Sequence, residues 1–206
     1  MEKPLFPAKY MRITQGYEEG THRDSYAIDN AGKDYEESDV YAPFTGIIKK
    51  IYPNDANEVW LESIDPVEYP DGTIDYMTVM FAHADNIDHL FVGKKINQKE
   101  VFYKEGTKGN VTGAHCHIEC AKGKLDGNGW HPNNAGYWSI NNGKKPEECF
   151  WIDDSIELTD NYGYNFKKIS TETVDNKNEF EFIAPKKDLY GVYLKEKQKI
   201  IIKSTE

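Results

Sequence analysis

The stretch Gly113-Ala114-His115-Cys116-His117-Ile118-Glu119 places two histidines one residue apart in a segment that we predict to be a strand. Side chains alternate across a strand, so one face would carry His115, His117 and Glu119 and the other Cys116, Ile118 and Cys120. A neutral imidazole is a common metal ligand and carries protons near neutral pH. The first face therefore indicates metal and proton chemistry, and the second indicates core packing. Taken alone, the motif also fits an exposed edge strand that happens to carry two histidines.

Three further segments stand in a defined order before this strand. Residues 21–29 read THRDSYAID and bring a histidine and an aspartate close together in the chain. Residues 39–48 read DVYAPFTGII, in which Pro43 and Gly46 mark a turn between two predicted strands. Residues 78–83 read TVMFAH, an apolar-rich strand that ends in a histidine. Four ordered motifs are far more specific than the paired histidines alone.

With these motifs in this order, residues 10–120 resemble the lysostaphin-like (LytM-type) zinc endopeptidases of peptidoglycan, particularly their phage endolysin branch. The resemblance implies a mainly β fold, with an antiparallel β-sheet core and an open groove. It implies one zinc ion bound by His22, Asp29 and His117, with His115 and His83 as the catalytic histidines. The implied activity is bacteriolytic: cleavage of peptide bonds in the bacterial cell wall for a phage or prophage.

The first histidine departs from the commonest pattern of this family, in which it stands four residues before the aspartate. Here His22 and Asp29 are seven residues apart, and the residue four before Asp29 is Ser25, a poor zinc ligand at neutral pH. Endolysin-type relatives resemble His-x-x-Ser-x-Ala-x-Asp, which the segment fits with Ser25, Ala27 and Asp29. We therefore expect His22 to reach the metal from a loop and Asp29 to reach it from a strand.

The physical chemistry of these residues agrees with the implied roles. Catalytic zinc takes three protein ligands from nitrogen and oxygen donors and keeps a fourth position for water. His115 lies two residues from His117, about 6.5 Å along a strand, so we expect it to take a proton from the attacking water instead of binding the same ion. His83 would hydrogen-bond the developing oxyanion or steady the water. Glu119 is a candidate acceptor for an imidazole N–H.

The remaining histidines and cysteines receive plainer interpretations. His89 and His131 match no catalytic position of the family and are expected on the surface or in the groove. A structural zinc cluster that combines the thiols of Cys116 and Cys120 with the paired histidines is excluded by parity, because the two sets point to opposite faces. The three cysteines cannot all pair within the chain, and nothing indicates a disulfide framework.

Charge and composition argue against some kinds of binding partner and against insertion in a membrane. The formal net charge of −10 argues against nucleic-acid binding, which favours a basic face. No stretch of about 18 apolar residues occurs, so we expect no membrane span. Residues 1–7 lack the pattern of a secretory signal. We therefore expect synthesis in the host cytoplasm and action on the wall after release, although a virion-borne wall hydrolase would look the same. The sequence does not indicate an oligomeric state.

The pattern of strands predicts two parts. Residues 1–149 would form the zinc peptidase domain, with residues 122–149 as an extension that lines the groove or packs over the core. Residues 150–206, with alternating stretches at 150–152, 162–169, 180–183 and 189–202, would form a small β appendage. The appendage is either an SH3-like wall-binding module or a plain extension of the catalytic domain. Peptidoglycan peptides are the expected partner, and a non-catalytic wall-binding or phage structural protein that keeps the fold is the alternative function.

Overall fold

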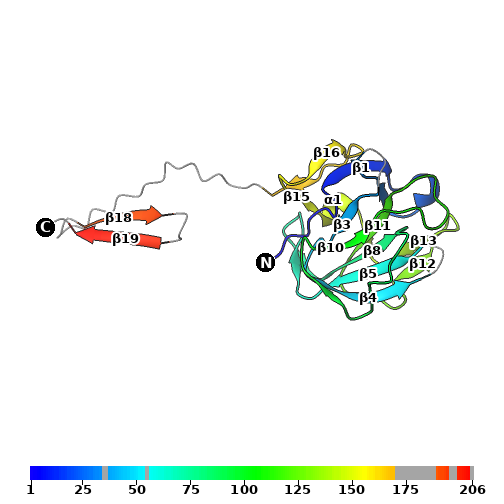
Figure 1. Ribbon diagram of the computed structural model, residues 1–206, viewed down its shortest axis with the longest axis horizontal. Coiled ribbons are helices and arrows are strands. Elements are labelled where there is room, and N and C mark those ends of the chain that lie inside the picture. The colour runs from blue at the N-terminus through cyan, green and yellow to red at the C-terminus, as the bar shows by residue number, and fades with distance from the viewer. Residues whose placement is uncertain (34–36, 54–55, 170–188, 195–198, 205–206) are drawn as a thin grey trace. The chain divides into compact units, whose positions relative to one another are not determined.

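The computed structural model describes residues 1–33, 37–53, 56–169, 189–194 and 199–204, and divides the chain into two units (Figure 1). The first unit, Met1–Ile169, contains every residue predicted for the site. In the second unit, Ser170–Glu206, strand β18 (Leu189–Leu194) pairs antiparallel with β19 (Lys199–Ser204). Within the part of the chain that is described, no helix has the length and hydrophobicity needed to cross a bilayer.

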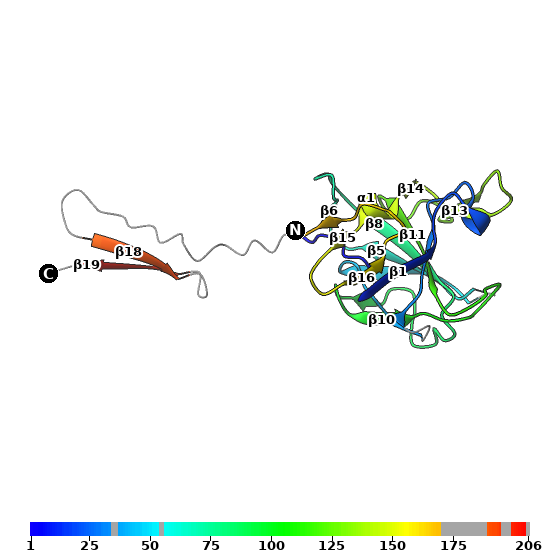
Figure 2. The same cartoon turned by 90° about the horizontal axis from the view of Figure 1, so that it is seen from above.

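A nine-stranded sheet forms the centre of the first unit. Its order along the main path is β16 (Glu157–Asp160), β1 (Tyr10–Gln15), β2 (Ile28–Asn30), β11 (Cys116–Lys122), β8 (Met77–Ala82), β5 (Glu58–Ser63), β4 (Gly46–Tyr52) and β9 (Lys95–Ile96), with β14 (Gly143–Lys144) paired to β11. Neighbouring pairs are antiparallel except β1 and β16, which run parallel and lie side by side in Figures 1 and 2. The prediction of a mainly β fold with an antiparallel core is confirmed.

The alternation of side chains gives this sheet one face on the main core and a second face, called here the site face, which carries His117 and Glu119 together with a smaller hydrophobic cluster. On the core face, Ile118, Phe81 and Val59 are partners across β11, β8 and β5, and all three are almost completely buried. On the other face, Glu119 is the partner of Met80, which in turn is the partner of Trp60. The alternation of faces predicted for the paired-histidine strand is therefore in register across β11, β8 and β5.

Short elements complete the unit. The two strands predicted around Pro43 both form, but they belong to different sheets, because β3 (Asp39–Tyr41) pairs with β10 (Val101–Lys104) whereas β4 pairs with β5 and β9. The other elements are the 3₁₀ turn η1 (Gly20–His22), the helix α1 (Pro146–Cys149), and the strand pairs β6 (Val67–Glu68) with β7 (Ile74–Asp75), β12 (Trp130–Pro132) with β13 (Trp138–Ile140), and β15 (Trp151–Ile152) with β17 (Lys167–Lys168).

Residues 150–169 pack with the first unit. The backbone N–H of Trp151 donates to Pro4 O (2.7 Å), and Phe150 and Trp151 are both buried. The structure thus divides the chain after Ile169, twenty residues later than the boundary that the sequence predicts. The predicted stretch at 180–183 lies outside the described residues, and a wall-binding role for the second unit stays a prediction.

Candidate metal centre

The three predicted ligands converge on the site face of the sheet. Asp29 in β2 is the direct partner of His117 in β11, and the distance between Asp29 Oδ1 and His117 Nδ1 is 3.0 Å. His22, the last residue of η1, brings its Nε2 to 3.3 Å from the same carboxylate oxygen. One donor atom from each of the three residues lies within 4.8 Å of the other two. The predicted ligand set is therefore brought together in space.

The loop between β1 and β2 explains how a histidine at the longer spacing reaches the site. His22 is only 2% exposed, and its backbone carbonyl accepts hydrogen bonds from both the backbone N–H and the hydroxyl of Ser25 (3.0 Å each). Ser25, which occupies the position of the usual family histidine, thus holds the turn that carries His22 inward. The distance between the ring centres of His22 and His117 is 4.8 Å.

Each of the four histidines of this cluster has one ring nitrogen engaged by an acceptor other than Asp29. The four pairs are His22 Nδ1 with Gly16 O (3.0 Å), His83 Nδ1 with Lys108 O (2.8 Å), His115 Nδ1 with Gly113 O (2.9 Å) and His117 Nε2 with Glu119 Oε1 (3.2 Å). A carbonyl or carboxylate can only accept, so the engaged nitrogen carries the proton. In the neutral imidazole the opposite nitrogen then has a free lone pair. Such outer acceptors are what orients metal-binding histidines in proteins.

His115 and His83, the predicted catalytic pair, lie beside the three ligands. His115 Nε2 is 3.5 Å from Asp29 Oδ1, and the rings of His83 and His115 have centres 4.7 Å apart. His83 directly follows β8 and has a backbone φ of 86°, a conformation that few residues other than glycine adopt. Gly106 fixes the backbone of His115, because the two residues exchange two backbone hydrogen bonds (3.2 Å each).

The charges of the site favour a cation. Burial alone would raise the pKa of Asp29, but hydrogen bonds from His117 and His22 outweigh it and hold that pKa well below its ordinary value. Burial would lower the pKa of His117, but Asp29 and Glu119 raise it to about 10. Burial lowers the pKa of His83 to about 4, so this ring is neutral near pH 7. The protein therefore stabilises one positive charge between Asp29 and Glu119.

These observations fit a zinc ion. Two imidazole nitrogens and one carboxylate oxygen match the donor set of catalytic zinc sites, and soft thiolate ligands are not needed. The thiols of Cys116 and Cys120 belong to buried residues of the main core cluster, on the opposite face of β11. A metal at this position would take the place of the proton on His117 Nδ1 and neutralise the same carboxylates.

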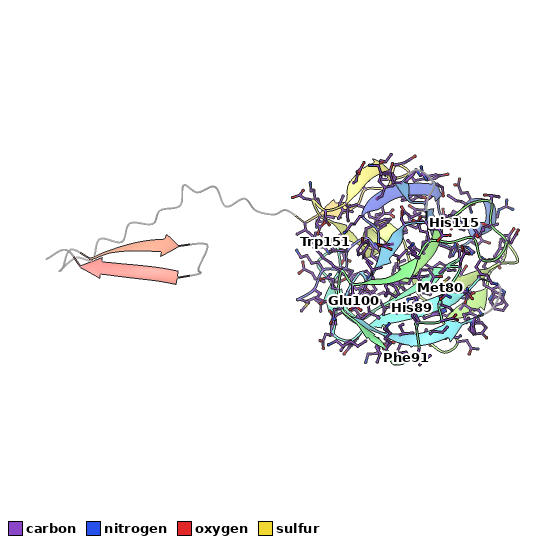
Figure 3. The ribbon with its side chains drawn as sticks, in the orientation of Figure 1. Met80, His89, Phe91, Glu100, His115 and Trp151 are labelled. Atoms are coloured by element: carbon purple, nitrogen blue, oxygen red, sulfur yellow. The ribbon has the colours of Figure 1, made fainter. Side chains whose placement is uncertain are left out.

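One feature of the site was not predicted in full from the sequence. Glu119 accepts from His117 as expected, but its other oxygen also accepts the backbone N–H of Ile140 in β13 (2.8 Å). Glu119 thereby joins a ligand to the β12–β13 hairpin, whose side chains border the site. His89 and His131 take no part: His89 Nε2 faces Phe102 O (3.0 Å) and His131 Nδ1 faces Asn141 Oδ1 (2.8 Å). Figure 3 shows His89 and His115 on different parts of the first unit.

Comparisons with solved structures find partial matches, several of them to peptidases. No model of a known protein family matches the chain. Among solved structures, LytU is 20% identical (TM-score 0.46, 66% of this chain and 82% of that one). A catalytic-domain variant of the prophage-encoded M23 protein EnpA from Enterococcus faecalis is 21% identical (TM-score 0.45, 61% and 90%). A zinc-containing peptidase from Vibrio cholerae is 19% identical (TM-score 0.44), with 59% of this chain matching 37% of that one. The chain spans well under half the length of the last of these.

Proposed function

We propose that this protein is a zinc-dependent endopeptidase that cleaves peptide bonds in peptidoglycan, and that it serves as a phage or prophage endolysin. One observation carries the proposal: His22 Nε2 and His117 Nδ1 lie 3.3 Å and 3.0 Å from the same oxygen of Asp29, while the other nitrogen of each imidazole is engaged by an outer acceptor. Three ligands of this type are characteristic of catalytic zinc, whereas structural zinc takes four protein ligands.

A bound zinc ion would supply Lewis-acid polarisation of the scissile carbonyl and a water of lowered pKa. His115 Nε2, whose opposite nitrogen donates to Gly113 O, has a lone pair directed at the site and can accept a proton from the attacking water. The same nitrogen can then return the proton to the leaving amine. His115 is therefore the general base and acid of the proposal.

We propose one of the two roles expected for His83. Its Nδ1–H donates to Lys108 O, and its pKa of about 4 keeps the ring neutral, so Nε2 can accept a hydrogen bond but not donate one. Of the two roles expected for it, steadying the attacking water fits this protonation state and donating to the oxyanion does not. Glu119 positions His117 by fixing which nitrogen carries the proton.

The site of action follows from the substrate. An endolysin is made in the host cytoplasm and acts on the wall after release, as we propose here. A net charge of −10 provides no general attraction to an anionic wall. Recognition would then depend on specific contacts in the groove beside the candidate metal centre.

The test combines metal analysis with product analysis on the full chain. We expect purified protein to retain about one zinc per chain and to release peptide fragments from purified wall material, with mass spectrometry identifying the bond that is cut. A chelator should abolish release and added zinc should restore it. Tight zinc retention with no fragments released from any wall chemotype would instead favour the non-catalytic alternative.

Three variants separate the roles. His117→Ala should lose both zinc and fragment release, whereas His115→Ala should keep zinc and lose nearly all turnover. His89→Ala is the matched control, because His89 is exposed and its hydrogen-bond partner, Phe102 O, lies outside the cluster. Wild-type turnover in His115→Ala would refute the assignment of the base.

A further inference from the structure

A hollow of about 160 Å³ lies beside the candidate metal centre, on the site face of the sheet. One end is bordered by His83 and His117. Its floor comes from small or apolar residues on two neighbouring strands, with Ala82 the partner of His117 and Met80 the partner of Glu119. The far wall is the β12–β13 hairpin, which contributes Trp130, Trp138, Ser139 and Ile140.

The hairpin is held firmly enough to act as a wall. Beyond the bond from Ile140 to Glu119, Asn133 Nδ2 donates to Arg23 O (2.9 Å) and Ser139 Oγ donates to Asp24 O (3.2 Å). Both acceptors belong to the turn that carries His22. The wall is therefore tied to the segments that carry two of the candidate metal ligands.

A lysine ammonium provides a further attachment of this part of the chain, in this case to β4. Lys50 Nζ in β4 donates to Asn128 O (2.6 Å) and lies 3.6 Å from the centre of the Trp130 ring. Its ammonium also lies 4.7 Å from the ring centre of Tyr52. A positive charge therefore already lies against the Trp130 ring.

The lining and the charges around the hollow favour a neutral guest. Ala56, Ala82, Met80 and Ile140 contribute aliphatic surface, and Trp60 and Trp130 contribute aromatic surface. Two carboxylates also line the hollow, and each has partners of its own: Glu119 is engaged by His117 and by the backbone N–H of Ile140, and Glu58 interacts electrostatically with the Lys50 ammonium. These carboxylates disfavour an anion, and the ammonium of Lys50 beside Trp130 disfavours a second cation. An apolar cavity of about 150 Å³ is large enough for a guest the size of benzene, so the space suits an aliphatic side chain of about four carbons.

Trp138 supplies an open contact at the mouth of the hollow. This side chain is 62% exposed, although it lines the same space as the buried Trp60. A large exposed aromatic side chain next to a candidate active site is characteristic of a surface that receives a partner. Tyr137, its neighbour in the chain, is 42% exposed and does not line the hollow.

We propose that this hollow is a specificity subsite, which selects substrate peptides that place a neutral aliphatic side chain next to the bond being cut. That the guest is a substrate rests on the proposed function, but the binding site itself depends only on Trp130, Trp138 and the floor between them. Trp138 is the residue that decides the affinity, because it is both exposed and in contact with the space.

The test measures binding directly, without requiring hydrolysis. The four tryptophan indole N–H signals of the ¹⁵N-labelled full chain, assigned from single Trp→Phe variants, are followed during titration with N-acetyl-leucinamide. We expect saturable shifts at Trp130 and Trp138 and none at Trp151, whose indole N–H donates to Glu68 O (2.9 Å) and which does not line the hollow. N-acetyl-glycinamide should produce no saturable shift.

Two variants sharpen the result. Trp138→Ala should weaken leucinamide binding about tenfold, and the matched variant Tyr137→Ala should leave it within about twofold. Equal responses to the leucine and glycine amides, or unchanged affinity in Trp138→Ala, would overturn the proposal. So would a response of Trp138 to N-acetylglucosamine but not to the leucinamide, since that would indicate a sugar-stacking surface.

Kinetics on wall peptides separate the two proposals. If the chain is a peptidase, Trp138→Ala should raise KM for peptides with an aliphatic residue at this position and leave kcat nearly unchanged. If the leucinamide binds but no wall fragment is ever released, the proposed activity fails and the subsite stands. If fragments are released at the same KM by both proteins, the subsite fails and the activity stands.

Discussion

Glu105, behind the strand that carries Asp29, offers a quantitative test of the electrostatics. Its side chain is 1% exposed. One carboxylate oxygen accepts the backbone N–H groups of Gly32 (2.7 Å) and Ser38 (3.3 Å), and the other faces Asn30 Nδ2 (3.4 Å). These bonds lower the pKa, but burial outweighs them and raises it from 4.5 to about 7. Ionising Glu105 in the folded protein is therefore costly.

The sign of the effect follows from linkage. Because the folded protein binds this proton more tightly than the unfolded chain, the stabilisation is fully present below pH 4.5 and is lost as the pH rises through about 7. At 1.36 kcal/mol per pKa unit the full loss is about 3 kcal/mol, of which about 2.5 kcal/mol falls between pH 5 and pH 8. Glu105→Gln keeps a carbonyl acceptor for Gly32 and removes the ionisation.

The assay is urea unfolding of wild type and Glu105→Gln at pH 5, 6, 7 and 8. Every other titrating group is common to the two proteins, so the difference in their unfolding free energies isolates Glu105. We expect that difference to move in favour of the variant by about 2.5 kcal/mol between pH 5 and pH 8, or about 1 M in urea midpoint. A difference that stays constant with pH would refute the reasoning, because it would mean that Glu105 titrates as it does in the unfolded chain.

Three further outcomes are expected. Free zinc at a hundred times its Kd should raise the melting temperature by about 5 to 10 °C, and calorimetry should show no such rise for His117→Ala. Gly106→Ala should lower kcat and stability together, because the added Cβ would lie 2.4 Å from His83 O, whereas Gly113→Ala, with no atom within 4 Å, should keep wild-type values for both. Lys50→Met should cost about 1 to 2 kcal/mol in urea unfolding, since it removes an ammonium held 3.6 Å from an indole ring and 2.6 Å from a carbonyl oxygen. An unchanged midpoint for Lys50→Met would mean that the hairpin needs no such attachment.

Local pattern was enough to predict the mainly β fold and the two faces of β11. The alternation of His115, Cys116 and His117 requires opposite faces wherever the strand is placed. The pairing of Asp29 with His117 could not be obtained in the same way, because strand order depends on contacts between distant segments. The resemblance to a family supplied that pairing as an expectation, and the register of β2 against β11 gives it a physical basis.

What local pattern could not predict lies mostly in backbone acceptors and long-range packing. The carbonyls of Gly16, Lys108 and Gly113 engage three histidines, and no side chain in the sequence marks them. The second contact of Glu119 depends on how the β12–β13 hairpin folds back over the sheet. The division after Ile169 reflects contacts such as that of Trp151 with the N-terminal segment, a long-range contact that periodicity does not report.

Because it pairs Asp29 with His117, the cluster can also report when a long-range contact forms during folding. The two residues are 88 positions apart, and they become neighbours only when β2 has inserted between β1 and β11. Closing so long a loop is slow compared with forming a local hairpin. A refolding chain would therefore bind a metal only late in folding. The loss of colour from a zinc–chelator complex, followed by stopped-flow mixing, would measure the rate at which β2 and β11 pair.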